Sequence, residues 1–261
     1  MPAPKVTVIV ATHDRPEWLA VSLQSILASA AMGAIKGILT RVLVVDDAST
    51  TEATKATCDR LGVDYLRNPV HDGRTTPSTA RVLGIANVDT PYFAFFDDDD
   101  FMLPRFIPLH VAALEAGHDV CSTAFWLTNQ DLEIRRKVVP MPATMGDLLA
   151  GFVAINDQSL VRTGIAQDVT WDAGLENVMM YAAWMEMMDR GRSFHLITEP
   201  TFLYRRHHGN TSDRLGSRDL ALRRALRGRY RQQFSAHIDG VPGPTRRWRR
   251  LIWRARHAVP R

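Results

Sequence analysis

Residues 92–104 read YFAFFDDDDFMLP, an apolar run that ends in four consecutive aspartates and is followed by a proline. Such a run is typical of a strand that is buried on both faces. At the end of a strand, residues two apart point the same way, so Asp97 and Asp99 present their carboxylates together while Asp98 points elsewhere. Paired oxygen ligands suit Mg²⁺ or Mn²⁺, especially an ion shared with phosphate oxygens. The alternative is a solvated acidic turn.

Further strand-like runs precede this one in the sequence. They are KVTVIVA at residues 5–11, RVLVVDD at 41–47 and VDYLRN at 63–68. Helical stretches alternate with them, at residues 16–30, 51–62 and 77–88. This alternation predicts βαβ units, and hence an α/β protein with a Rossmann-like, mostly parallel sheet flanked by helices. Ligands bind beyond the carboxyl ends of such strands, where both acidic clusters fall.

The pattern is looser after residue 104. It predicts a helix at 104–116, strands at 120–127 and 133–139, a helix near 144–150, and a long helix at about 175–190 that ends at Gly191. The C-terminal residues 214–261 hold 14 Arg and 2 Asp, and the break DGVPGP at 239–244 divides them into two helical pieces. This Arg-rich helical tail is expected to have partners different from those of the acidic body.

Composition narrows the classes of protein. At 261 residues with 46% hydrophobic content, the chain is long enough for one sizeable core. The N-terminal residues do not read as a signal peptide, and no stretch has eighteen uninterrupted apolar residues, so we expect a cytoplasmic protein without a membrane span. The two cysteines, Cys58 and Cys121, have neither the number nor the spacing of a disulfide framework or a structural zinc site.

Five segments, taken in order, resemble the family 2 glycosyltransferases, which have the GT-A fold and use nucleotide-diphosphate sugars. FFDDDDFMLP is similar to the family's D-x-D-D-x-x-x-P segment, and VLVVDDAST to its V-D-D-G-S segment, with Ala48 in place of Gly. The opening VTVIVATHDRPEWL, the series RNPVHDGRTTPSTARVLGIANV and YRRHHGNTS resemble the remaining three. The resemblance implies a nucleotide-sugar-binding half at residues 1–103 and an acceptor-binding half at 104–213, followed by the tail.

The resemblance also implies roles for individual residues. Thr12 and the loop to Arg15 would border the nucleotide, and Asp46 or Asp47 would read the base. Arg81 would approach the diphosphate, although the Asn that follows it in the family is Val82 here. The aspartates Asp97, Asp98 and Asp99 would contact the ribose and the metal. Metal ligands are expected to be Asp97, Asp99 and His207, with Asp99 the direct one and His207 closing over the diphosphate or the ion.

The expected catalytic base is missing. Aligned without gaps on the family's acceptor-side motif, the Glu-Asp pair falls on Met179 and Met180, and methionine cannot accept a proton. Glu176 lies four residues before Met180, so on a continuous helix the two would share a face. We therefore take Glu176 as the candidate general base, with Asp157 and Asp172 as weaker candidates. The methionine-rich stretch is most simply explained as core, with an apolar acceptor groove as the alternative.

The resemblance, together with the aspartates, implies a metal-dependent glycosyltransferase that uses Mn²⁺ or Mg²⁺ and is inverting like its family. UDP is the first choice of donor nucleotide, with dTDP or GDP next, and the acceptor is an envelope glycan, a lipid-linked saccharide or a small natural product. The alternative is a catalytically impaired protein of the same fold that only binds donor. In RRWRRLIWRARHAVPR, apolar residues recur at helical spacing between arginines, which suits an anionic membrane surface at the inner face of the membrane. A solvated helix, a homodimer contact and nucleic-acid binding are less favoured alternatives for this tail.

Overall fold

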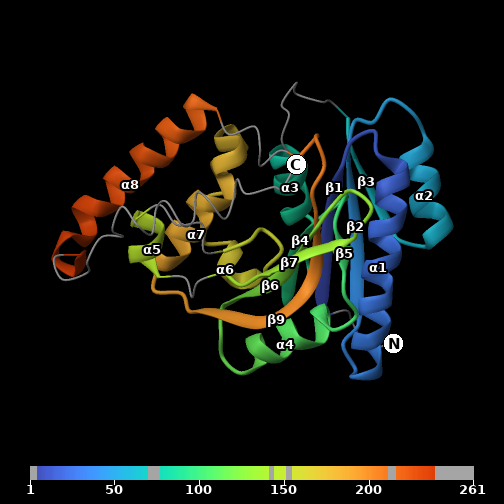
Figure 1. Ribbon diagram of the computed structural model, residues 1–261, viewed down its shortest axis with the longest axis horizontal. Helices are drawn as coiled ribbons and strands as arrows, with labels where there is room; N and C mark the ends of the chain where they lie inside the picture. The colour runs from blue at the N-terminus through green and yellow to red at the C-terminus, as the bar shows by residue number, and fades with distance from the viewer. Residues whose placement is uncertain (1–4, 70–76, 141–143, 151–154, 211–215, 239–261) are drawn as a thin grey trace.

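The buried β-branched runs form the centre of a sheet. The computed structural model describes residues 5–69, 77–140, 144–150, 155–210 and 216–238 (Figure 1). Strands β1 (Val6–Thr12), β2 (Thr40–Asp47), β3 (Asp64–Asn68) and β4 (Tyr92–Asp97) are parallel, in the spatial order β3-β2-β1-β4. The predicted parallel half of the sheet is confirmed.

Alternate residues of these strands face two separate layers of core. On β1, Val8 and Val10 pack into one hydrophobic cluster and Ile9 into the other. Helix α1 (Pro16–Ile35) covers the first face, while α3 (Ser78–Ile85) covers the second. Helix α2 (Ala53–Leu61) lies beside α1 (Figure 1). A continuous apolar strand is therefore required, because both faces of the sheet are covered.

Helix α1 is long and apolar enough to cross a membrane by length and composition, at 20 residues. In this structure its Leu19, Leu23 and Ile26 are fully buried against the sheet. Burial of this kind is expected of the core helix of an α/β protein.

The second half of the chain extends the sheet and makes it mixed. Strand β8 (Leu160–Arg162) is antiparallel to both β4 and β6 (Val120–Thr128), and β6 is parallel to β9 (Phe194–Arg205). The spatial order is β3-β2-β1-β4-β8-β6-β9-β5, where β5 is Phe101–Met102, and β7 (Ile134–Val138) pairs with β6. Neither β8 nor β9 is evident from the sequence pattern. The short β8 has too few residues to show a period, and β9 mixes polar and apolar residues.

Helices enclose the second half. Helix α4 (Phe106–Glu115) lies beneath the sheet in Figure 1, and α5 (Met145–Ala150), α7 (Met179–Asp189) and α8 (Ser217–Ile238) form the left-hand side of the view. The short α6 (Thr163–Ala166) follows β8 directly. Helix α8 confirms that the start of the Arg-rich tail is helical. Residues 239–261, including the apolar positions proposed for membrane contact and the break at 239–244, lie outside the described residues.

The long helix predicted at 175–190 is wrong in its first turn. A 3₁₀ helix, η1 (Ala173–Val178), precedes α7, and Glu176 within η1 has φ 47° and ψ −119°. A backbone with positive φ interrupts the helical repeat, so Glu176 and Met180 do not share a continuous helical face. The expectation that Glu176 lies on the helical face of Met180 is therefore wrong.

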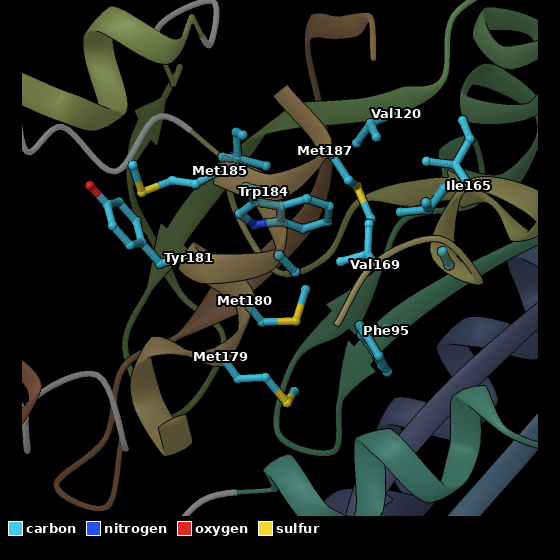
Figure 2. Close-up of a cluster of buried hydrophobic side chains, with 14 of the residues drawn as sticks. Phe95, Val120, Ile165, Val169, Met179, Met180, Tyr181, Trp184, Met185 and Met187 are labelled. Carbon is cyan, nitrogen blue, oxygen red and sulfur yellow. The ribbon is translucent and has the colours of Figure 1, made fainter. Parts of the chain in front are cut away.

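The methionines of α7 are core. Met179, Met180, Met185 and Met187 are at most 5% exposed. Figure 2 shows their side chains around Trp184, with Val169 and Phe95 among the residues of the same cluster. An unbranched thioether fits the irregular space between a helix and a sheet. The core explanation of this stretch is confirmed for these four residues.

A buried histidine makes the stability of the fold depend on pH. His110 on α4 is fully buried, its Nδ1 lies 2.7 Å from the carbonyl oxygen of Phe106, and within the described residues its Nε2 has no partner. Burial lowers the pKa of His110 to about 4. Between pH 6.5 and about 4, His110 is protonated in the unfolded chain but not in the native one. The free energy of unfolding therefore falls as the pH drops through this range.

Replacing His110 by Phe should remove this dependence, because a phenyl ring can keep the stacking on Phe106 and cannot be protonated. We expect the stability of the variant relative to wild type to increase by about 3 kcal/mol between pH 7 and pH 4. Urea unfolding of both proteins at a series of pH values measures the difference, in which the contributions of other titrating groups cancel. Parallel pH curves for the two proteins would contradict the assignment.

Candidate active site

Three adjacent parallel strands end at one edge of the sheet and carry the predicted site residues. Thr12 is the last residue of β1, Asp47 of β2 and Asp97 of β4, and β1 lies between the other two. Strand register places Thr12 opposite Asp46, and Ala11 opposite Asp97. Parallel strands bring these side chains together because their carboxyl ends lie at the same edge.

The aspartates form a cluster of three, with the fourth turned aside. Asp97, Asp99 and Asp100 each offer a carboxylate oxygen within 4.8 Å of the others. Asp98 instead accepts a hydrogen bond from the Thr12 hydroxyl at 2.7 Å. The prediction that Asp97 and Asp99 converge while Asp98 points elsewhere agrees with this geometry. Asp100 was missed, although the D-x-D-D pattern includes it.

Two arginines and a histidine from three distant segments contact the cluster. Arg15 Nη1 lies 3.3 Å from oxygens of both Asp98 and Asp99, and His207 Nε2 lies 2.9 Å from Asp99. Arg81, from α3, donates to Asp97 at 2.6 Å and to Asp157 at 2.9 Å. The long β9 brings His207 to Asp99 across 108 residues of sequence. Of the expected donor-site residues, Thr12, Arg15, Arg81 and His207 therefore meet at the aspartates.

Burial makes the cluster electrostatically unfavourable without a cation. Burial, with Asp99 nearby, raises the pKa of Asp97 even though Arg81 opposes the shift. Burial and Asp99 together raise the pKa of Asp98 to about 7 and that of Asp100 well above its ordinary value. Each shift reflects the cost of holding a negative charge in this place. A divalent cation is the type of ligand that would lower that cost.

The two aspartates at the end of β2 differ in their surroundings. Asp46 is fully buried, and both its oxygens have partners: the Ser49 amide at 2.8 Å, and the Tyr65 hydroxyl at 2.7 Å. Asp47 Oδ1 accepts from the Asn68 side-chain amide at 2.6 Å. Asp46 therefore stabilises the turn after β2. Ala48, at the family's Gly position, has φ 59°.

The loop before β8 adds two residues to the site. Asp157 pairs with Arg81, as described above, and Gln158 donates its amide Nε2 to both Asp97 and Asp100 at 2.8 Å. Asp157 was considered only as a weaker base and Gln158 was missed. A lone Gln in an irregular segment gives no signal in the sequence, because its role depends on strand pairing between β8 and β4.

Two of the carboxylates considered as bases accept hydrogen bonds from groups outside the aspartate cluster. Asp172 is the N-cap of η1 and accepts from the Gly174 amide at 2.8 Å. Glu176 Oε1 accepts from Arg218 Nη1, on α8, at 2.7 Å, and its side chain is 24% exposed. Neither residue contacts the aspartate cluster through the bonds above. Asp172 thus has a structural explanation, and Glu176 combines a carboxylate with a strained backbone.

Solved structures with the same fold include several glycosyltransferases. TarS from S. aureus in complex with UDP-GlcNAc matches with a TM-score of 0.59 at 16% identity, over 80% of this chain and 60% of that one. Glucosyl-3-phosphoglycerate synthase from Mycobacterium tuberculosis matches with 0.59 at 14%, over 86% and 79%. Mannosyl-3-phosphoglycerate synthase from Rubrobacter xylanophilus matches with 0.60 at 13%, over 88% and 75%. This chain thus spans about 60% of the TarS fragment, and the likeness identifies a GT-A fold.

Comparison by sequence identifies the family. No curated protein matches the chain significantly by sequence. The family model described as glycosyl transferase family 2 matches residues 7–172, which include β1, the turn after β2, the aspartate cluster and Gln158. The match covers more than half of the chain and contains the strand ends that converge in the structure, and the chain therefore belongs to glycosyl transferase family 2.

Proposed function

We propose that this protein transfers a sugar from a nucleotide diphosphate to an acceptor hydroxyl, with inversion at the anomeric carbon and with the help of a divalent cation. The observation that carries the proposal is the convergence of Asp97, Asp99 and Asp100 with Arg15, Arg81 and His207 at one edge of the sheet. Alternating carboxylates and cationic donors are suited to bind a metal diphosphate, which presents both positive and negative groups.

The residues present fit Mn²⁺ or Mg²⁺. Three carboxylates converge, and the imidazole of His207 touches one of them, which is an acceptable donor set for either ion with a preference for Mn²⁺ where imidazole binds. Asp99 would be a direct ligand, with Asp97 and His207 beside it. When bound, the ion neutralises charge that develops on the departing diphosphate. The structure of the M. tuberculosis synthase contains Mn²⁺ and UDP, which supports this choice.

Cationic side chains would bind the remaining phosphate charge. Arg15 lies at the start of α1, contacts Asp98 and Asp99 and is partly exposed, so its guanidinium is proposed to bind a phosphate. Arg81 is only 7% exposed and forms an ion pair with Asp97. Because it is buried, we propose that it orients Asp97 and does not contact a phosphate. Asp47 and Thr12 would border the base and ribose. UDP is the proposed nucleotide, with dTDP and GDP as alternatives that present a similar imide to a carboxylate.

Glu176 remains our proposed general base. Its backbone occupies a region that residues other than Gly rarely adopt, and such strain in a non-Gly residue often accompanies a functional role. Its carboxylate accepts a hydrogen bond from Arg218 on α8, which orients it. A base on the acceptor side is what a single-displacement, inverting transfer requires.

A second candidate function is donor binding without transfer. Met179 and Met180 occupy the family's Glu-Asp position and are buried in the core, so no carboxylate at that position accepts a proton. A partner protein that senses nucleotide sugar would need the donor site alone. Sugar transfer or donor hydrolysis distinguishes the two functions.

Further proposals concern the acceptor and the location of the protein in the cell. The acceptor is a glycan, a lipid-linked saccharide or a small molecule with a free hydroxyl. The Arg-rich C-terminal segment is proposed to hold the protein at an anionic membrane surface on the cytoplasmic side. Liposome flotation with and without residues 240–261 tests this, and equal flotation of both forms with anionic lipid would contradict it.

Calorimetric titration with UDP, dTDP and GDP, with and without Mn²⁺, tests the proposed function. We expect one nucleotide to bind and its affinity to depend on Mn²⁺. Assay of the matching nucleotide sugars for hydrolysis or transfer then separates the enzyme from the binding protein. Failure of every nucleotide to bind in the presence of Mn²⁺ would contradict both functions.

A further inference from the structure

Gln158 contacts two of the clustered carboxylates at once. Its side chain is almost fully buried, and the single nitrogen Nε2 lies 2.8 Å from Asp97 Oδ2 and 2.8 Å from Asp100 Oδ2. The residue stands two positions before β8, and β8 pairs with the strand that ends at Asp97. Strand pairing thus fixes the amide beside the cluster.

The other oxygens of these two aspartates are held from different sides. Asp97 Oδ1 accepts from Arg81 at 2.6 Å, and Asp100 Oδ1 accepts from the backbone amide of Arg205 at 2.9 Å. Each carboxylate therefore has one fixed donor of its own and shares Gln158 with the other. Rotation of either carboxylate breaks a hydrogen bond, so their planes are set by this arrangement before any ligand binds.

A neutral donor suits this position better than a cationic one. Asp97, Asp99 and Asp100 each bring a carboxylate oxygen within 4.8 Å of the others, so acidic groups are closely spaced here. A Lys or Arg at position 158 would neutralise their charge and compete with a divalent ion. An amide orients both carboxylates and leaves their negative charge to attract the ion.

We propose that Gln158 is a positioning residue for the metal site: by donating one amide group to Asp97 and Asp100, it holds both carboxylates where they and Asp99 converge on a divalent cation. The inference rests on the proposed metal dependence and deepens it. It assigns to the loop before β8 a share in metal affinity that neither the sequence pattern nor the metal ligands themselves reveal.

The loop that carries Gln158 is anchored independently of it. Asn156 donates to the Thr123 carbonyl at 2.7 Å, and the Ser159 hydroxyl donates to the Asn156 carbonyl at 2.8 Å. Gln158 can therefore be changed without removing the bonds that shape the loop. Ser159, which is equally buried and whose hydroxyl hydrogen-bonds to Asn156 in the same loop, supplies a matched control.

The test replaces Gln158 by Met, which keeps the length of the side chain and removes both hydrogen bonds. Mn²⁺ binding is measured by electron paramagnetic resonance of the free ion, with and without UDP, on wild type, Gln158→Met and Ser159→Ala. We expect Gln158→Met to bind Mn²⁺ about 10- to 100-fold more weakly and Ser159→Ala to bind it as wild type does. Thermal unfolding of each protein in a metal chelator verifies that it is folded.

A kinetic readout separates positioning from general damage. Turnover of Gln158→Met at saturating Mn²⁺ should approach wild type, while the Mn²⁺ concentration for half-maximal rate rises with the dissociation constant. A second variant, Gln158→Glu, replaces the donor by a third charge against Asp97 and Asp100. Its unfolding temperature in chelator should fall below that of Gln158→Met and be restored by excess Mn²⁺.

The outcomes are distinguishable from failure of the proposed function. Wild type that binds no Mn²⁺ with or without UDP contradicts the metal-dependent function itself. Wild type that binds Mn²⁺ with the same affinity as Gln158→Met overturns the role of Gln158 alone. Equal weakening in Gln158→Met and Ser159→Ala also overturns it, because loop integrity would then explain the loss.

Discussion

Replacing Asp99 by Asn is expected to remove the Mn²⁺-dependent part of nucleotide binding and to lower turnover by about 10³-fold. Asp99 is the aspartate that connects the cluster of carboxylates to His207 and Arg15, since both contact its Oδ2. Asn has the same shape but no charge, so packing is retained while the electrostatic attraction for a cation is lost. Calorimetry with UDP and Mn²⁺, beside initial rates, measures both effects.

A matched control for the loss of one carboxylate is Asp64→Asn. Asp64 begins β3 at the opposite edge of the sheet and pairs with Arg41 at the protein surface. Surface pairs of this kind contribute little to stability, so the variant should bind and turn over as wild type does. Mn²⁺-dependent UDP binding that persists in Asp99→Asn would show that the cluster is not the metal site.

The second large effect is expected at Glu176, where two substitutions lower turnover alike and differ in their effect on stability. Glu176→Gln keeps the backbone and removes the proton acceptor, so turnover should fall about 10²-fold or more while donor affinity is unchanged. The turnover of Glu176→Gly should fall by the same factor. This variant should also be more stable by about 1 kcal/mol, because glycine adopts φ 47°, ψ −119° without steric cost.

The ion pair with Arg218 changes this expectation little. Arg218 is 68% exposed, and a pair exposed on one side is worth only a fraction of a kcal/mol, about 0.2–1. The stability change measured by chemical denaturation of Glu176→Gly therefore reports mainly the relief of backbone strain at position 176. A gain in stability together with a loss of turnover would identify Glu176 as a residue held in strain for its chemistry.

Glu199→Gln is the control for this pair of variants. Glu199 is a partly exposed carboxylate on β9 that pairs with Arg105 at 2.7 Å, much as Glu176 pairs with Arg218. It should leave turnover unchanged. Near-normal turnover in Glu176→Gln would exclude Glu176 as the base. Asp157 would then be the next candidate, because Arg81 donates to both Asp157 and Asp97 and so links it to the cluster.

Local pattern predicted the parallel half of the sheet because each of its elements carries its own signal. A β-branched run, a Pro at the start of α1 and a Gly after α2 each act within a few residues, independently of the rest of the chain. Placement of the acidic pairs at the carboxyl edge followed from the same alternation, since parallel strands must end on one side.

Interruptions of local pattern were not predictable. A helical period runs through Glu176, and nothing in the neighbouring letters indicates that its φ is positive. The packing of η1 against α3 and α8 sets that angle against local preference. Sequence periodicity detects what a segment prefers by itself, and tertiary contacts decide where it departs from that preference.

By itself, the sequence determined the α/β class, the parallel direction of the first strands, and the identity of the aspartates at the edge of the sheet. The tertiary structure alone decided that Asp100 completes the cluster, that Asp46 serves the turn, and that Gln158 contacts the aspartates. The reason is range: a strand or a cap is set by residues within a few positions, whereas β8 and β9 bring Gln158 and His207 to the aspartates across 58 and 108 residues. Contacts at that separation depend on strand pairing, which no short stretch of sequence specifies.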